Sequence, residues 1–222
     1  MCTVSIVPSS SGFRIVCNRD ERRTRPIAES PTVHGMGRMR GIWPSDPASG
    51  GTWIGANDAG LAMVLLSRRT GIARASVVSR GTIIPDLLRL PSIEAAVDAV
   101  KRLPLARFEP FTLVIAQERV VRAVTMGATS RWRAHAMSRP LLFTSSSLGD
   151  ALVTGPRRRL FARLVRDCAS PLRGQRAFHR HAWPTRPEIS VVMSRPDAAT
   201  VSRTVLDVSA GAIQMHYTRI CE

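Results

Sequence analysis

A chain of 222 residues and 24.3 kDa is long enough to bury one full-sized hydrophobic core without metal ions or disulfides. Its 44% hydrophobic and 22% charged residues exclude the disordered, fibrous and small disulfide-rich classes, and no apolar run approaches the roughly 20 residues of a membrane-spanning helix. The formal net charge is +16, but Lys101 is the only lysine among the 32 basic residues. We therefore attribute the charge to biased amino-acid usage and expect no specific nucleic-acid partner.

The N-terminal residues predict a β-hairpin. Apolar and polar residues alternate over Cys2–Val7 and over Phe13–Cys17, and Pro8–Gly12 between them is a cluster of turn-forming residues. The first residues lack the basic segment and apolar stretch of a secretory signal, so we expect a cytoplasmic protein.

Residues 20–51 are polar, rich in Pro, Gly and Arg, and show little periodicity, which predicts a long functional or mobile loop. A second hairpin is predicted after it, with strands Thr52–Ala56 and Leu61–Ser67 around the turn Asn57–Gly60. These strands are apolar enough to be buried on both faces.

The middle of the chain predicts two helices, over residues 82–90 and 92–103, with Ser92 as the N-cap of the second. Four strands are predicted to follow them in the chain, namely Phe111–Gln117, Val120–Met126, Arg131–Met137 and Leu141–Ser145.

A third helix is predicted from about Thr154 to Cys168, with Pro156 in its first turn. Much of its basic group, which is Arg157-Arg158-Arg159 with Arg163 and Arg166, is expected on a solvated face. The last segments are a predicted loop, Pro171–Pro187, and three predicted strands, Glu188–Ser194, Val201–Val208 and Ala212–Thr218. Helices are thus segregated from strands, which favours an antiparallel α+β fold, and residues 1–222 are predicted to form a single domain.

The four cysteines show no spacing typical of a zinc site, so we expect reduced thiols and no metal. Cys17, Cys168 and Cys221 are expected to be buried small apolar residues. Cys2 differs because removal of Met1 would leave it with both a thiol and a free α-amine. The amine can then act as the base that activates the thiol, although position alone favours a plain strand residue.

The polar run Asn18-Arg19-Asp20-Glu21 ends the second predicted strand. A hairpin returns that end to the start of the first strand, so Asn18, Arg19 and Asp20 are expected close to Cys2. Arg19 would favour the thiolate, and Asp20 would orient the amine by accepting a hydrogen bond.

Four segments in this order resemble the NRDE family, whose eukaryotic members are called transport and Golgi organisation protein 2. They are Met1-Cys2-Thr3, Asn18-Arg19-Asp20-Glu21, Arg25-Pro26 and Gly50-Gly51-Thr52-Trp53-Ile54-Gly55. Looser matches are Ser145–Asp150 leading to Pro156-Arg157, and Thr200–Thr204.

The resemblance implies an αββα sandwich of mostly antiparallel strands, similar to N-terminal nucleophile (Ntn) hydrolases, with Cys2 as the nucleophile. The wider relatives, choloylglycine and penicillin V acylases, also begin Met-Cys-Thr and carry an Arg and an Asp that Arg19 and Asp20 match. Their Gly-x-Asn-Glu-x-Gly-Leu turn is matched by Gly55–Leu61, which contains Asn57.

One departure concerns the oxyanion donor. Several of these relatives place an Asn just after the following strand, where this chain has Ser67. Loss of a dedicated donor costs about 10²–10³ in rate. The residues expected to contact a substrate are Asn18, Trp53, Ser145 and Ser146, of which Trp53 is also expected to pack the core.

The five histidines are scattered, and His179 and His181 fall in a predicted loop beside Trp183. We expect exposed loop histidines there, with a metal or haem ligand as the alternative. The Met-containing segment Gly35–Met39 is interpreted as a mobile loop first, and a soft ligand second.

Two functions stay open. The first is a Cys2 amidohydrolase acting on a small molecule. The second is a non-catalytic protein that binds haem, acyl-CoA or lipid on the same scaffold, since the eukaryotic relatives are linked to haem handling and to acyl-CoA or lipid homeostasis. No cofactor is expected to be required, haem is a candidate ligand, and the oligomeric state is left open.

Overall fold

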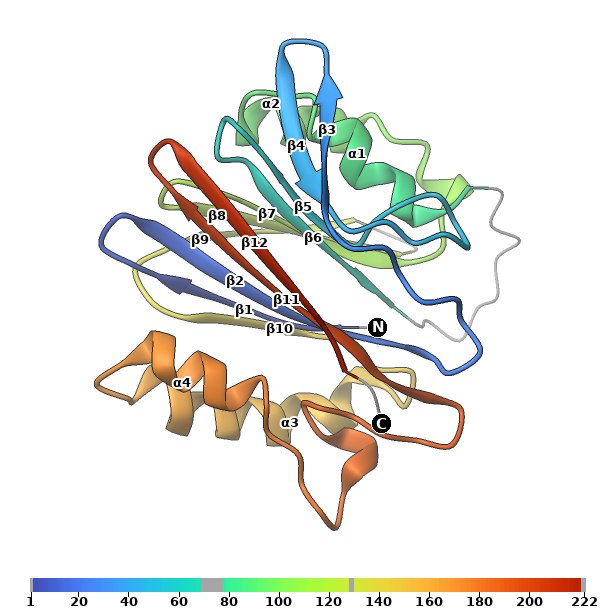
Figure 1. Ribbon diagram of the computed structural model, residues 1–222, viewed down its shortest axis with the longest axis vertical. Helices are drawn as coiled ribbons and strands as arrows, with labels where there is room; N and C mark the ends of the chain where they lie inside the picture. The colour runs from blue at the N-terminus through green and yellow to red at the C-terminus, as the bar shows by residue number, and fades with distance from the viewer. Residues whose placement is uncertain (1, 69–77, 128–129, 221–222) are drawn as a thin grey trace.

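A computed structural model describes residues 2–68, 78–127 and 130–220. In that part of the chain the strands form two antiparallel sheets packed face to face, and helices cover the outer face of each sheet (Figure 1). The layers therefore run helix, sheet, sheet, helix, which confirms the predicted α+β class and the αββα sandwich.

The first sheet has the strand order β10-β1-β2-β11-β12. The strands are β1 (Cys2–Pro8), β2 (Gly12–Arg22), β10 (Leu141–Thr144), β11 (Ala198–Ser209) and β12 (Ala212–Arg219). Two helices, α3 (Asp150–Phe161) and α4 (Pro171–Phe178), cover its outer face (Figure 1).

Strand β1 is buried on both faces although its sequence alternates. Val4 and Ile6 face the second sheet, whereas Thr3 and Ser5 face the α3–α4 layer. The two polar side chains find partners there, since Thr3 accepts a hydrogen bond from Arg157 and Ser5 one from Gln175. A polar face of a strand can thus be fully covered when the covering helices supply partners.

The second sheet has the order β3-β4-β5-β6-β7-β8-β9. The strands are β3 (Thr32–Met36), β4 (Met39–Trp43), β5 (Ile54–Asn57), β6 (Ala62–Ser67), β7 (Phe111–Gln117), β8 (Val120–Met126) and β9 (Arg131–Ala136). Helices α1 (Ile83–Leu87) and α2 (Ile93–Lys101) cover it, and Ser92 caps α2 as predicted by accepting a hydrogen bond from Ala95 N at 3.2 Å.

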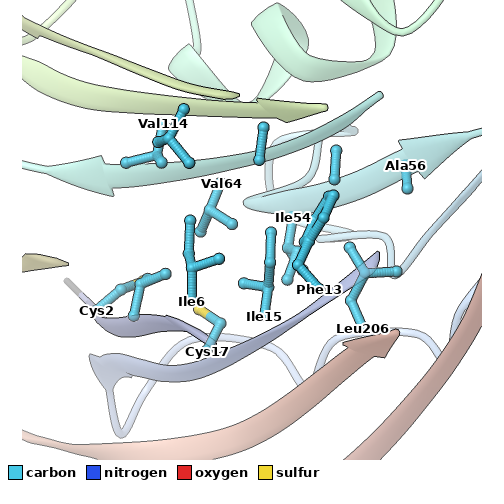
Figure 2. Packing of buried hydrophobic residues seen from close by; sticks show 14 of the residues in the cluster. Cys2, Ile6, Phe13, Ile15, Cys17, Ile54, Ala56, Val64, Val114 and Leu206 are labelled. Atoms are coloured by element: carbon cyan, nitrogen blue, oxygen red, sulfur yellow. The ribbon is translucent and has the colours of Figure 1, made fainter. Parts of the chain in front are cut away.

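The main core lies between the sheets. Ile6 and Ile15 of the first sheet meet Ile54, Val64 and Val114 of the second (Figure 2). Each such side chain contributes about 1.5–3 kcal/mol by leaving water. Cys2 lies at one end of this core. The burial of the other β1 residues fixes the position of the strand and therefore that of Cys2.

The predicted loop over residues 20–51 is wrong in its middle, because β3 and β4 form a hairpin there. The rings of His34 and Trp43 stack across the two strands, with centroids 3.9 Å apart, and Gly37 adopts the positive φ of 74° that the turn needs. Cross-strand aromatic contacts stabilise this hairpin. Its many Gly and Arg residues gave no strand pattern in the sequence.

The predicted loop Pro171–Pro187 is also wrong, because its first half is α4. Gly174 allows this helix to approach the preceding turn, since a Cβ there would lie 1.7 Å from the carbonyl oxygen of Leu164. Helix α3 begins at Asp150 rather than near Thr154, and after Phe161 it continues as a turn of π-helix, η3 (Ala162–Arg166).

The predicted strand Glu188–Ser194 is wrong as well. Residues Pro187–Ile189 form a 3₁₀ turn, η4. The guanidinium of Arg157 donates hydrogen bonds to the carbonyl oxygens of Ile189 and Ser190. These carbonyls are therefore not free for a strand ladder. Arg157 itself is fully buried and is therefore not part of the solvated face that was expected for much of this basic group.

Two cysteine predictions have different outcomes. Cys17 is buried as expected, whereas Cys168 is half-buried at the end of the α3–η3 segment. Cys221 lies outside the described residues.

The remaining helical elements are two short 3₁₀ turns, η1 (Arg80–Thr82) and η2 (Leu105–Arg107). Among the helices of the described ranges, none has the length and apolar character to cross a bilayer.

Candidate active site around Cys2

A cleft of about 590 Å³ opens beside the first residue of β1, and we call it the Cys2 cleft. Cys2, Arg19, Trp53 and Ser67 all line it. Much of the remaining lining is charged and comprises Glu21, Arg22, Arg25, Asp46, Arg68, Arg80, Glu109 and Asp197. The structure thus brings together four of the residues singled out from the sequence, in a polar setting.

Cys2 is held by the end of β10. Its backbone N donates to Ser145 Oγ at 3.3 Å, and Ser145 N donates to the carbonyl oxygen of Cys2 at 3.1 Å. Its side chain is only 3% exposed. The position of the α-nitrogen is therefore set by one hydroxyl and one backbone bond.

The neighbouring thiol of Cys17 changes the acidity of Cys2. A hydrogen bond from Cys17 lowers the pKa of the Cys2 thiol and outweighs burial, which raises it. Asp20 raises the pKa of Cys2, and Arg19 lowers it, but the effect of Arg19 is the smallest of all. Burial and the bond to Cys2 raise the pKa of Cys17 well above its ordinary value. Cys2 is thus the more acidic thiol of the pair.

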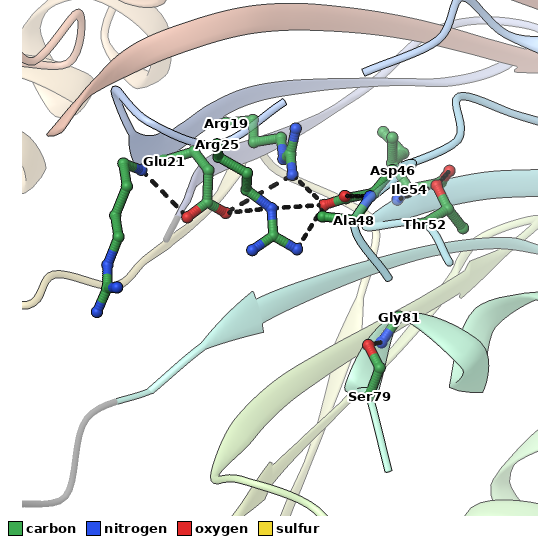
Figure 3. Close-up of polar contacts among 10 residues, drawn as sticks. Arg19, Glu21, Arg25, Asp46, Ala48, Thr52, Ile54, Ser79 and Gly81 are labelled. Carbon is green, nitrogen blue, oxygen red and sulfur yellow. Dashed lines mark hydrogen bonds and ion pairs between the residues drawn. The ribbon is translucent and has the colours of Figure 1, made fainter. Parts of the chain in front are cut away.

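Arg19 is opposite Cys2 in the β1–β2 ladder and forms a wall of the cleft. Its guanidinium lies over the ring of Trp53, 4.1 Å from the centroid, and hydrogen bonds to Asp46 (Figure 3). Arg25 shares the same carboxylate, with Nη2 2.8 Å from Asp46 Oδ2, and Glu21 lies 3.6 Å from both arginines. This neutralises much of the charge of Arg19.

Asp46 was missed by sequence reasoning because it lies in the aperiodic segment before the second hairpin. Arg25 was part of the family pattern, but nothing in the spacing linked the two. Their pairing becomes visible only when residues 20–51 are folded against β2.

Asp20 turns to the helix-facing side of β2, since side chains alternate along a strand. Its carboxylate accepts a hydrogen bond from Thr200 Oγ1 at 2.6 Å. Burial raises the pKa of Asp20, and the charge of Arg157 offsets part of that rise. The carboxylate is close enough to Cys2 to affect its thiol, although it does not line the cleft.

Asn18 lies on the same helix-facing side and is fully buried there. Its amide nitrogen donates to the carbonyl oxygens of His179 (3.0 Å) and Val191 (2.9 Å). The ring of His179 bonds Asn18 Oδ1 at 3.1 Å and Ser5 Oγ at 2.7 Å. The expectation of an exposed His179 is therefore wrong, because α4 buries it against β1 and β2, and burial lowers its pKa well below the ordinary value.

The turn after β10 is fixed by Arg195, a second residue that the sequence did not indicate. Its Nη1 donates to Ser147 Oγ at 2.8 Å and its Nη2 to Ser146 Oγ at 3.1 Å. Ser147 lines the cleft, whereas Ser145 and Ser146 are buried behind it. The position of Arg195 just before β11, beside the looser family match, was the only available signal.

Asn57 lies elsewhere. Its side-chain nitrogen donates to the carbonyl oxygens of Leu88 and Leu90, both at 2.8 Å, and its oxygen accepts from Ala59 N and Leu61 N. It lines a different hollow, at the turn end of the strands. Asn57 was expected near Cys2 from the acylase-like turn, and it does not line the Cys2 cleft. Ser67, at the end of β6 and at the place of the oxyanion donor in the relatives, does line it.

Within the described ranges, no group of three or more His, Cys, Asp and Glu side chains is arranged to hold a metal ion. The site chemistry rests on a thiol, hydroxyls, guanidinium groups and carboxylates.

A sequence model of the family described as Transport and Golgi organisation 2 matches residues 1–152. This segment contains Cys2, Arg19, Asp46 and the turn at Ser145. No curated protein matches the chain in sequence.

Solved structures with a similar fold are Ntn hydrolases. An N-acylethanolamine-hydrolyzing acid amidase ortholog from Caenorhabditis elegans superposes with a TM-score of 0.61 at 15% identity, covering 92% of each chain. Penicillin V acylase from Agrobacterium tumefaciens gives 0.56 at 12% identity, over 99% of this chain and 86% of its own. Conjugated bile acid hydrolase from Clostridium perfringens, as a variant, gives 0.57 at 10% identity, over 99% and 92%.

Proposed function

The chain belongs to the Transport and Golgi organisation 2 family and has the Ntn-hydrolase fold, and from this premise we propose that Cys2 is the nucleophile of a site that hydrolyses an amide bond of a small molecule. The observation that carries the proposal is the position of Cys2 at a polar cleft, with a thiol whose pKa is lowered and an α-nitrogen already hydrogen-bonded to Ser145.

The reaction needs Met1 to be removed, which frees the α-amine of Cys2. The amine takes the thiol proton, and the thiolate sulfur attacks the amide carbonyl carbon. The C–N bond then breaks, and the departing amine receives the proton. Water hydrolyses the remaining thioester, which returns the thiol and releases a carboxylic acid. Ser145 orients the amine throughout, because its hydroxyl already accepts a hydrogen bond from that nitrogen.

Two groups of the cleft suit the substrate carbonyl. Ser67 offers a hydroxyl donor to the developing oxyanion. Trp53 also lines the cleft, and its buried indole N–H has no hydrogen-bond partner among the described residues. An unsatisfied buried donor is costly, so an acceptor on a bound substrate would stabilise it.

The test is a comparison of one preparation before and after a specific protease removes an N-terminal extension so that Cys2 becomes the first residue. Hydrolysis of a panel of N-acyl amides is measured as released amine. We expect activity only after cleavage, and none in the Cys2→Ala protein treated identically. Activity that is equal before cleavage, or that survives Cys2→Ala, would remove Cys2 from the reaction.

A second function is favoured by the hollow at the opposite end of the sheets. It encloses about 670 Å³ between the turns of several hairpins, roughly 20 Å along β1 from Cys2, and Phe13, Ile42 and Val208 are apolar residues in its lining. We propose on this basis, as the alternative, a carrier of an apolar chain such as an acyl group. Haem fits less well, because the described residues that line this hollow include no His, Cys, Met or Tyr to ligate iron.

The carrier proposal is tested by titrating a fluorescent fatty acid into the Cys2→Ala protein. Ile213→Glu places a charge in the lining of the hollow and should abolish saturable binding. Binding that is unaffected by Ile213→Glu would refute this location.

A further inference from the structure

The outer α3–α4 layer is far more basic than the α1–α2 layer. Residues 150–186 contain nine arginines and two aspartates, whereas residues 78–109 contain five basic and four acidic residues. Only Arg157 of the nine is buried. The other eight arginines of this layer are exposed, namely Arg158, Arg159, Arg163, Arg166, Arg173, Arg176, Arg180 and Arg186. The charge is therefore concentrated on the side of the molecule that Figure 1 shows below the first sheet.

A concave site lies within this layer. It encloses about 440 Å³, has a floor of the buried Leu160 and Ile189, and is bordered by Trp183. Arg159, Arg163 and Arg186 complete the lining together with Pro156. We call it the Trp183 pocket. Its volume falls in the range of about 300–1,000 Å³ typical of small-molecule sites.

The wall of the Trp183 pocket is held in place by buried hydrogen bonds. Arg157 Nε donates to the carbonyl oxygen of Ile189 at 3.0 Å, and Arg157 Nη2 donates to that of Ser190 at 2.6 Å. Trp183 N donates to Ser190 Oγ at 2.8 Å, and His181 packs edge-on against the Trp183 ring at 4.8 Å. The pocket is therefore preformed, which lowers the entropic cost of binding a ligand.

The arginines of the pocket lack strong internal partners. Arg159 and Arg163 are one helical turn apart, where like charges repel, and neither forms an ion pair within the described ranges. Arg186 has a carboxylate of Glu188 at 3.8 Å, between side chains that are about half exposed. A bridging anion would turn this repulsion into attraction.

We propose that the Trp183 pocket binds a nucleotide, with the base against Trp183 and the phosphates on Arg159, Arg163 and Arg186. An apolar floor and an indole wall suit one flat ring, and the guanidinium groups at the rim suit phosphate oxygens. A flat membrane surface or a duplex could contact the exposed arginines but would not use the concave floor. The proposal does not depend on the chemistry at Cys2.

The test is calorimetric titration of the full-length protein with ATP, with inorganic tripolyphosphate as the ligand without a ring. The double variant Arg159→Gln/Arg163→Gln should weaken ATP binding at least about tenfold. The matched control is Arg131→Gln/Arg133→Gln on β9, which removes the same charge from two exposed arginines and should change affinity less than about twofold. Trp183→Leu should weaken ATP about tenfold and leave tripolyphosphate unchanged.

Several results would overturn the proposal. They are the absence of saturable ATP binding, equal affinity for ATP and tripolyphosphate, or equal losses in the two double variants. Tighter binding of duplex DNA that depends equally on both arginine pairs would assign the layer to nonspecific polyanion contact. If the double variant does not fold by circular dichroism, Arg186→Gln alone carries the same expectation, with a smaller loss.

Discussion

At the scale of single residues, Cys2 owes its acidity first to another thiol. The hydrogen bond from Cys17 lowers the pKa of Cys2, while the guanidinium of Arg19 is occupied by Asp46 and contributes least. Sequence reasoning assigned the activating role to the α-amine of Cys2 or to Arg19. It could not find the thiol pair, because Cys17 is diagonal rather than opposite to Cys2 in the ladder.

The first prediction concerns this pair. Cys17→Ala removes the donor, so the pKa of Cys2 should rise, whereas Cys17→Ser keeps a donor and should shift it less. The measurement is the rate of iodoacetamide labelling at Cys2 against pH, followed by peptide mapping. If the Cys17→Ala profile overlies that of the unmodified protein, Cys17 does not tune the nucleophile. Arg19→Ala is expected to shift the profile less than Cys17→Ala.

The second prediction concerns His179. Burial lowers its pKa in the folded protein, so below about pH 6.5 the unfolded chain binds a proton at this residue that the folded protein does not bind. Its contribution to stability is complete above the unfolded pKa of about 6.5 and is lost as pH falls below that value, by at most about 1.4 kcal/mol per pH unit.

Urea unfolding at pH 7.5 and 5.5 measures this loss. His179→Gln keeps hydrogen-bonding capacity towards Ser5 and Asn18 without titrating in this range, so its stability should depend less on pH. Equal pH dependence in the two proteins would contradict the assignment to His179.

Some residue positions followed from the sequence and others could not. The hairpin argument places Arg19 beside Cys2, as the structure shows. It also led us to expect Asn18 and Asp20 at the site, whereas the alternation of side chains along β2 turns both to the helix-facing side. The partners of those two side chains, His179 and Thr200, come from segments more than 150 residues away. No local pattern reports contacts at such separation.

At the scale of elements, Arg157 joins α3 to three other segments of the chain. It donates to Thr3 of β1, to Thr144 of β10, and to two carbonyl groups of the 187–190 turn. One guanidinium thus holds the helix layer against the strand that carries Cys2 and also shapes the Trp183 pocket.

The third prediction follows from that position. Arg157→Met keeps the bulk but leaves buried acceptors without donors, so it should cost about 3 kcal/mol of unfolding free energy. The adjacent Arg158→Met, on the exposed face, should stay within about 0.5 kcal/mol. Chemical denaturation measures both, and similar small losses would mean that Arg157 is not a structural tie.

Elements with strong local sequence signals were predictable, and elements defined by tertiary contact were not. Strands β7 and β8 have the predicted bounds, since each is a short, mainly apolar run and only two residues separate them. Helix α4 was missed because Pro171 and Gly174 are typical of loops, whereas in the fold Pro171 starts the helix and Gly174 packs closely on η3. Strand β2 continues to Arg22, beyond the predicted end at Cys17, because β11 supplies a partner along its whole length.

At the scale of the whole molecule, three separate concave sites lie around the core of the sandwich. The Cys2 cleft and the hollow at the hairpin turns are at opposite ends of the strands, and the Trp183 pocket lies in the outer helix layer. The Cys2 cleft holds a thiol in a polar setting, the hollow has both apolar and charged residues in its lining, and the Trp183 pocket combines arginines with one indole. The central claim of this account concerns the first, namely that Cys2 is an N-terminal nucleophile.

The most direct measurement of that claim is the intact mass of the protein with Cys2 as its first residue, taken during incubation with an N-acyl amide that it cleaves. The account predicts an added acyl mass on Cys2 that hydroxylamine removes, as a thioester requires, and no added mass in Cys2→Ala. A preparation that releases amine without any acyl mass on Cys2, or that carries the acyl group on another residue, would contradict the claim.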